Sequence, residues 1–208
     1  MNKELRVIIV GVTAATWLVA ALLWGLPTTI LGAARPFLAA ITAASVVLWV
    51  YETQIWHWPI FRRWLTKIPD LRGVWRVEIQ STWIDPDTGN PIGPIEGFAQ
   101  VDQTATNFCM RTFTEESRSK TVAYAFSFDQ EVFKLAIVYE NQPHISLREK
   151  RSAYHQGSAA FHVRGYKPVS FSGEYWTERK SIGTFSVSSR KKGEIDSFEA
   201  GRELFAKP

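Results

Sequence analysis

The 208-residue chain contains a single cysteine, Cys109, so it cannot form an internal disulfide. A lone cysteine fits a reducing cytoplasm, and it is more often a buried apolar residue than a nucleophile. The four histidines have no metal-ligand spacing with one another or with acids. The sequence has neither a glycine-rich phosphate loop nor a G-x-S-x-G elbow. These absences predict a protein that is not an enzyme, with no catalytic residues, no metal site and no cofactor.

Excess charge is also missing from most of the chain. Residues 70–208 hold 18 basic and 18 acidic side chains, whereas residues 1–69 hold six basic and two acidic ones, which accounts for the whole net charge of +4. Domains that bind nucleic acid carry a basic patch or stripe. The balanced region is therefore not expected to bind nucleic acid in general, and neither DNA nor RNA is predicted as a partner.

Two long apolar runs occupy the first quarter of the sequence. Residues 5–26 contain one charge, Arg6, and residues 30–51 are interrupted only by Arg35 and Pro36. Each run is long enough, at about 1.5 Å per residue, to cross a hydrocarbon core of roughly 30 Å. A cleaved signal peptide is the alternative for the first run, but such a peptide has a shorter apolar region. We therefore predict a transmembrane helical hairpin over residues 1–51.

Basic residues near the ends of these runs predict the orientation of the hairpin, because basic flanks stay on the cytoplasmic side. They lie before the first run, in the connector and after the second run: Lys3, Arg6, Arg35, Arg62, Arg63 and Lys67. Both termini are therefore expected in the cytoplasm. Residues 52–69 mix tryptophans with basic residues, which predicts a segment at the level of the lipid headgroups. An ordinary linker with aromatic anchors is the alternative interpretation.

Small residues four positions apart occur in both runs and allow close approach of helices in lipid. The pairs are Gly11 with Ala15, Ala39 with Ala43, and Ala40 with Ala44. Packing of the hairpin on itself explains one such face. The second face on residues 30–51 is available for a neighbouring subunit.

From Asp70 onward the pattern changes to an alternation of β-branched and aromatic residues with polar ones. Short turns separate eight candidate strands, at residues 73–83, 95–103, 106–116, 120–128, 132–141, 157–166, 169–178 and 181–189. The number of strands and the short connections predict an all-β domain over residues 70–208, an antiparallel eight-stranded β-barrel. Residues 194–205 have apolar positions near helical spacing, and a small C-terminal helix is expected to close one end.

One parity of several strands carries large side chains, which are predicted to fill the middle of the barrel: Trp75, Tyr124, Phe126, Phe133, Tyr139, Phe161, Tyr175 and Phe185. A ligand site would then lie at a mouth, where the inward rows become polar. The candidates are Thr177, Arg179, Tyr139, Arg111 and His155. Arginine pairs with phosphate and aromatic rings stack on bases, so this mixture suits an anionic, ring-bearing ligand. A solvated barrel rim is the alternative.

The order of two membrane spans and a cytoplasmic barrel resembles one known family, as do the stretches "GVW", "HQGSAAFHV" and "SGEYWTERKSIGTFSV". The chain is similar to the two-transmembrane, β-strand-rich (SMODS-associating) effectors of bacterial CBASS antiphage systems, which are encoded beside a nucleotide cyclase. The resemblance implies that the barrel binds a cyclic dinucleotide made upon phage infection. It further implies a multi-pass protein of the inner membrane that self-associates, disrupts the lipid bilayer and so aborts the infection.

The resemblance also points to individual residues of the ligand site. The "HxGS" stretch puts forward His155 and Gly157, and the "GxYxTxR" stretch puts forward Tyr175, Thr177 and Arg179. A glycine in a strand can instead serve close approach of the backbone or a bend. Gly157, like Gly173, remains open to that interpretation.

Two functions of other classes remain as alternatives. A membrane-tethered, lipocalin-like carrier would need an open cavity, whereas the predicted inward rows are crowded with aromatic side chains. An adaptor that recruits a partner protein would need an exposed apolar patch of several hundred Å², and no strand has a continuous outward apolar row.

Overall fold

The structure, a computed structural model, describes residues 3–25, 29–62, 65–84, 89–90, 92–129, 132–145 and 153–206. The chain divides into two compact units. The first comprises Met1–Lys67 with Thr104–Thr106, and the second comprises Ile68–Gln103 with Asn107–Pro208.

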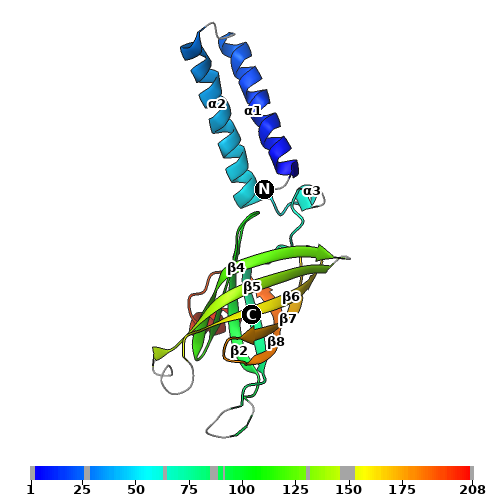
Figure 1. The fold of residues 1–208 in the computed structure, drawn as a ribbon, viewed down its shortest axis with the longest axis vertical. Helices are drawn as coiled ribbons and strands as arrows, with labels where there is room; N and C mark the ends of the chain where they lie inside the picture. Colours follow the sequence, from blue (N-terminus) through cyan, green and yellow to red (C-terminus); the bar gives the residue numbers. More distant parts are fainter. Residues whose placement is uncertain are drawn as a thin grey trace. The chain divides into compact units, whose positions relative to one another are not determined.

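Two helices, α1 (Lys3–Trp24) and α2 (Ile30–Val50), form an antiparallel hairpin in the first unit (Figure 1). Small side chains are buried in this unit, namely Ala20, Ala21, Ala40 and Ala44. Gly11 and Ala15, in contrast, are exposed. Within the described residues, one segment, Pro36–Ile55, is long and apolar enough to cross a membrane, and Ile9–Leu23 is a shorter apolar helix.

The segment after α2 folds into two short helical elements. A π-helical turn, η1 (Tyr51–Ile55), continues α2, and a single helical turn, α3 (Pro59–Arg62), follows. The hydroxyl groups of Tyr51 and Thr66 hydrogen-bond to each other and tie the two ends of this segment together. A position of this segment at the headgroup level stays a prediction.

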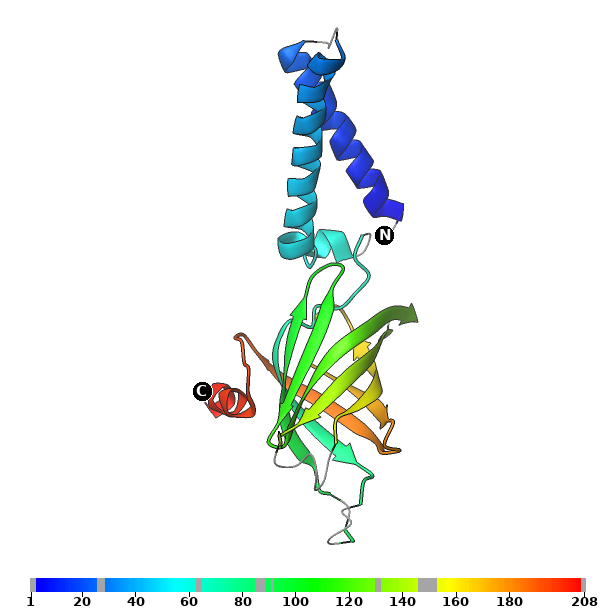
Figure 2. The same cartoon turned by 60° about the vertical axis from the view of Figure 1, so that its left-hand side comes forward.

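The second unit is a closed barrel in which every strand is antiparallel to the next, and the last strand pairs with the first (Figure 2). The predicted fold class is therefore confirmed. Its strands are β1 (Gly73–Ser81), β2 (Ile95–Gln103), β3 (Phe108–Thr114), β4 (Ser117–Asp129), β5 (Val132–Pro143), β6 (His155–Arg164), β7 (Ser170–Thr177) and β8 (Ile182–Lys191).

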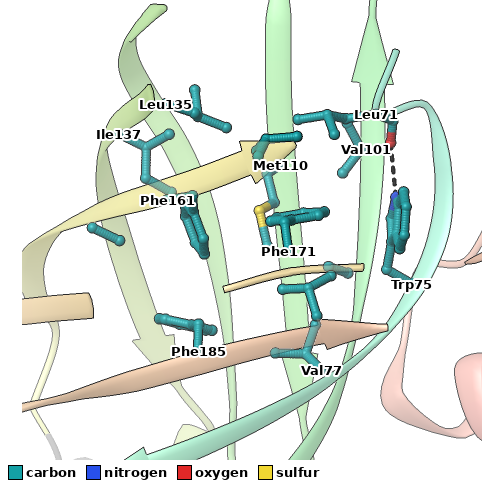
Figure 3. Packing of buried hydrophobic residues seen from close by; sticks show 14 of the residues in the cluster. Leu71, Trp75, Val77, Val101, Met110, Leu135, Ile137, Phe161, Phe171 and Phe185 are labelled. Carbon is teal, nitrogen blue, oxygen red and sulfur yellow. Dashed lines mark hydrogen bonds between the residues drawn. The ribbon is translucent and has the colours of Figure 1, made fainter. Parts of the chain in front are cut away.

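The predicted aromatic rows do point inward, because side chains alternate between the two faces of each strand. Seventeen strand residues, six of them from the predicted aromatic rows, form one buried cluster with Leu71. Phe161 packs against both Phe171 and Phe185 with ring centroids 5.6 Å apart (Figure 3). Tyr124 and Phe126 pack on the edge of this cluster. The middle of the barrel is therefore filled by side chains.

One end of the barrel, where β1 begins, is sealed by a buried polar network. The indole N–H of Trp75 donates to the carbonyl oxygen of Leu71 at 2.8 Å (Figure 3). The Gln103 side chain accepts from the backbone N–H of Leu71 and donates to the carbonyl of Pro69, both at 2.8 Å. The Asp70 carboxylate forms ion pairs with the guanidinium groups of Arg72 at 2.9 Å and Arg190 at 3.2 Å. These bonds satisfy polar groups that would otherwise be buried without partners.

The C-terminal helix, α4 (Phe198–Ala206), exists as predicted, but the expectation that it closes an end is wrong. It packs against the outer wall, where Phe98 stacks on Phe205 with centroids 5.4 Å apart. The reason is that Val74, Phe98 and Phe113 point outward and form a second apolar cluster with Ile195. The helix lies beside the outer wall of the barrel (Figure 2), and Phe198, Leu204 and Phe205 pack against this cluster.

Candidate ligand-binding site

The opposite end of the barrel contains a cavity of about 570 Å³. It lies where β1, β3, β5 and β7 end, so the last inward residues of these strands line it. Five of the six predicted site residues are among the lining residues: Tyr139, His155, Tyr175, Thr177 and Arg179. The volume is within the range of about 300–1,000 Å³ that is typical of small-molecule sites.

Two tyrosines form the boundary between this cavity and the aromatic core. Each lies across the strand from a glycine: Tyr139 pairs with Gly157, and Tyr175 pairs with Gly183. A Cβ atom on Gly157 would lie 2.5 Å from Cζ of Tyr139, and one on Gly183 would lie 2.6 Å from a ring carbon of Tyr175. The missing side chains therefore make room for the rings, and close approach is the structural reason for Gly157.

Both tyrosines are buried, with 8% of each residue exposed. Burial raises the pKa of Tyr139, and the neighbouring Tyr175 raises it further. Burial also raises the pKa of Tyr175, although a hydrogen bond with the Ser81 side chain opposes this effect. Both phenols are therefore neutral at physiological pH, and each hydroxyl can donate or accept a hydrogen bond.

His155 begins β6 and is buried, with 8% of the residue exposed. Its Nδ1 lies 2.9 Å from the carbonyl oxygen of Ala153. A carbonyl oxygen only accepts hydrogen bonds, so Nδ1 carries a proton and donates it to Ala153. This bond to the backbone fixes the orientation of the ring at the cavity.

The turn between β7 and β8 positions Thr177 and Arg179. The N–H of Lys180 donates to the carbonyl of Thr177 at 3.0 Å, and the N–H of Thr177 donates to the carbonyl of Ser181 at 3.0 Å. Lys180 has a φ of 63°, the left-handed conformation that such a three-residue hairpin loop needs. The inward row of β7 therefore ends in a charge because it runs into a turn whose tip, Arg179, borders the cavity.

The rest of the lining mixes apolar side chains with six hydroxyl groups, at Ser81, Thr112, Thr114, Ser117, Ser119 and Ser181. Three carboxylates, of Glu96, Glu115 and Glu116, border the cavity as well. Glu115 and Glu116 lie in the turn between β3 and β4. Among the described residues of the lining, Arg179 is the only lysine or arginine.

Arg111 is the predicted site residue that the structure places elsewhere. It lies on the outer face of β3, where its guanidinium pairs with the carboxylate of Asp102 across the strand pair. Its neighbours Met110 and Thr112 are buried on the inward side. Arg111 has the outward parity, so its inclusion in the inward row was wrong.

The sequence interpretation missed the hydroxyl residues of the lining. A usable signal exists, because Ser81, Thr112 and Ser119 continue the same parity as the buried residues of their strands. Taken one at a time, serines and threonines at strand ends are indistinguishable from ordinary solvated positions. Only the closed barrel brings them to one mouth.

Comparison with protein families identifies the barrel. Residues 66–189 match the family described as Cap15, cyclic dinucleotide receptor domain. The chain belongs to the Cap15 receptor family. The resemblance to CBASS effectors is thereby confirmed, and the Cap15 match covers all eight strands up to Ser189 of β8. The Cap15 barrel is a receptor for a cyclic dinucleotide, and a search of curated proteins finds no match to the chain.

Proposed function

We propose that the cavity at the open end of the barrel binds the cyclic dinucleotide, and that binding activates a membrane effector. The observation that carries this proposal is the convergence of Tyr139, His155, Tyr175, Thr177 and Arg179 on one cavity of a cyclic dinucleotide receptor domain. A carrier for apolar molecules is disfavoured, because the aromatic cluster fills the middle of the barrel.

The charges of the lining suggest how the ligand lies. Arg179 follows β7, whereas Glu115 and Glu116 follow β3, and these two strands are on opposite sides of an eight-stranded barrel. Guanidinium groups bind phosphate through charge-assisted hydrogen bonds, and carboxylates repel it. We therefore place the phosphates beside Arg179. Base edges with N–H donors then face Glu115 and Glu116, and base faces lie against the tyrosine rings.

The helical hairpin supports the membrane half of the proposal. Its apolar segments, Ile9–Leu23 and Pro36–Ile55, suit insertion into the bilayer. Basic residues near both ends of the hairpin favour cytoplasmic termini, with residues 52–69 at the inner surface and residues 70–208 in the cytoplasm of a bacterium. On ligand binding, the chains self-associate and the hairpins disrupt the inner membrane, which aborts the phage infection.

Calorimetric titration tests the ligand site. The full chain, in detergent micelles, is titrated with a panel of cyclic dinucleotides and with the matched linear dinucleotides. We expect saturable binding of at least one cyclic compound and much weaker binding of its linear counterpart. Absence of binding to the whole panel by folded protein would contradict the proposed site.

The Arg179→Ala variant assigns the phosphate contact. A hydrogen bond to a charged group contributes about 1.5–3 kcal/mol, so we expect an affinity loss of about 10-fold to 150-fold. Arg202→Ala is the matched control, because Arg202 is an exposed residue of α4 that does not line the cavity. Equal affinities of the two variants would remove Arg179 from the site.

Dye release tests the membrane half. Vesicles that contain the full chain and an enclosed dye receive the cyclic dinucleotide that binds in calorimetry. At a ligand concentration close to the Kd of the unmodified protein, we expect release with the unmodified protein and much less with Arg179→Ala. Binding without release would leave the receptor site intact and refute membrane disruption.

A further inference from the structure

The outer wall of the barrel carries a row of mostly apolar residues that runs across strands. Ala123 pairs with Val138 between β4 and β5, Val138 pairs with Ser158 of β6, and Ser158 pairs with Trp176 of β7. Trp176 is 50% exposed and Val138 is 37% exposed. The expectation that outward apolar rows are missing considered each strand alone, and this row crosses four of them.

A second row lies directly beside the first; it consists of alanines on β4, β5 and β6 and ends at Glu174 on β7. Ala125 of β4 pairs with Ala136 of β5, which pairs with Ala160 of β6. Ala125 and Ala136 are exposed, and Ala160 is half-buried. We call the two rows together the alanine face, defined by Ala123, Ala125, Ala136, Val138, Ala160 and Trp176. Such small side chains allow another backbone to approach a convex sheet closely.

Charges at the ends of β4 and β5 indicate what covers this face. On β4, Lys120 lies at one end of the alanine face, and Asp129 lies at the other. On β5 each end of the face carries the opposite charge to the neighbouring end of β4. Glu140 pairs with Lys120 at the first end, and Lys134 bonds to Asp129 at 3.3 Å at the second. Each strand therefore has opposite charges on either side of an uncharged middle.

This pattern is self-complementary. Consider a two-fold axis that lies in the plane of the alanine face and runs perpendicular to the strands. It places each strand opposite the same strand of a second copy, with the two strands running in opposite directions. Lys134 then meets Glu140 of the other chain, and Lys120 meets Asp129. Lys134 and Asp129 remain 52% and 60% exposed despite their mutual bond, so both can accept a further partner. Isologous contacts of this kind are the commonest in homo-oligomers.

The same strands connect the face to the ligand cavity. Trp176 lies between Tyr175 and Thr177, and Val138 lies beside Tyr139, so cavity residues and face residues alternate along β5 and β7. We infer that the alanine face is the surface through which two copies of this chain associate, with β4 and β5 of the two copies antiparallel. This inference deepens the self-association of the proposed function and does not depend on the identity of the nucleotide.

Cysteine cross-linking of the full chain in lipid vesicles, in the presence of the cyclic dinucleotide that binds in calorimetry, tests the face. In a Cys109→Ser background, Ala136→Cys puts one thiol close to the proposed axis, so a short bis-maleimide links two copies. Ser186→Cys is the matched control, because Ser186 is an exposed outward residue of β8. We expect at least about fivefold more covalent dimer from Ala136→Cys, since thiols near a two-fold axis meet in every dimer. Equal yields would overturn the proposal.

Charge reversal tests the orientation in the same cross-linking assay. Lys134→Glu and Glu140→Lys each place like charges together across the interface, and like-charge contacts cost several kcal/mol, so the yield should fall about tenfold or more. The double variant restores opposite charges across the axis and should restore the yield. Failure of that rescue, with each single variant impaired, would overturn the antiparallel arrangement.

An amine-reactive cross-linker separates failure of the face from failure of self-association. Amine-linked oligomers without A136C dimers would show that the chains associate through another surface, which overturns the alanine face and leaves the proposed self-association standing. If neither reagent links the chains in the presence of a nucleotide that binds in calorimetry, both are refuted, while the receptor site stands.

Discussion

The two ends of the barrel are built from the same alternating strands and yet differ in chemistry. Where β1 begins, a buried network around Trp75, Gln103 and Asp70 seals the end, and the polar groups bond to one another. Where β1 ends, hydroxyls, two phenols and Arg179 surround a cavity. The comparison teaches that stability and recognition are separated along the barrel axis. Substitutions at the sealed end should affect folding, and those at the open end should affect binding.

The largest effect is expected at the sealed end, from Trp75→Ala. Trp75 is fully buried, so its removal leaves a cavity and should lower the free energy of unfolding by about 3–5 kcal/mol. Trp83→Ala is the matched change at the open end, where the residue is only half-buried, and should cost much less. Urea unfolding of the full chain in micelles, followed by circular dichroism of the β-structure, measures both. Equal losses would contradict the division between the ends.

Gly157→Ala should lower both the stability of the barrel and its affinity for the nucleotide. The added methyl group would displace the ring of Tyr139 into the cavity, and overpacking of this kind costs about 1–3 kcal/mol. Nucleotide affinity should fall as well, because the ring borders the site. Gly93→Ala is the control, since Gly93 also lines the cavity but has open space around its Cα. Unfolding and calorimetric titration of both variants check this, and relief of the stability loss by Tyr139→Leu would confirm the steric cause.

Asp70→Asn should remove an acid-sensitive part of the stability of the sealed end. Burial alone would raise the pKa of Asp70, but Arg72 and Arg190 more than compensate and hold the pKa below its ordinary value of 3.8. The ionised carboxylate therefore stabilises the fold above pH 3.8, and this contribution is lost as the pH falls through the lowered pKa. We expect Asp70→Asn to cost about 1 kcal/mol at neutral pH.

The pH dependence of unfolding provides the check. The difference in stability between the unmodified chain and Asp70→Asn should be constant at neutral pH and shrink as the pH falls below 3.8. A difference that is the same at all pH values would assign the role of Asp70 to its shape and not to its charge.

The smallest effect on stability is expected from Arg179→Ala. Arg179 is exposed at the tip of a turn, and such surface changes usually stay within about 0.5 kcal/mol. Arg190→Ala is the comparison at the sealed end, since that guanidinium bonds to Asp70 and lies 5.4 Å from the centroid of Trp75. Chemical unfolding of the two variants should rank Arg190 well above Arg179. The opposite order would make Arg179 a structural residue.

Patterns along the chain predicted most of the fold. Alternation gave all eight strands, and the segment at 95–103 coincides with β2. Parity also predicted the inward row of β7, including Tyr175 and Thr177. Parity failed for Arg111. The end of β3 carries polar residues of both parities, and the sequence does not mark which parity faces the inside of the barrel.

By itself, the sequence determined the apolar hairpin, the alternating strands and the aromatic filling of the barrel, because each depends on local periodicity and on burial of large side chains. Only the tertiary structure decided that hydroxyl residues from several strands meet at one mouth. It also decided that glycines lie beneath Tyr139 and Tyr175, and that α4 covers the wall instead of an end. These features depend on strand register and barrel closure, which join residues far apart in the chain and leave no periodic signal within any one strand.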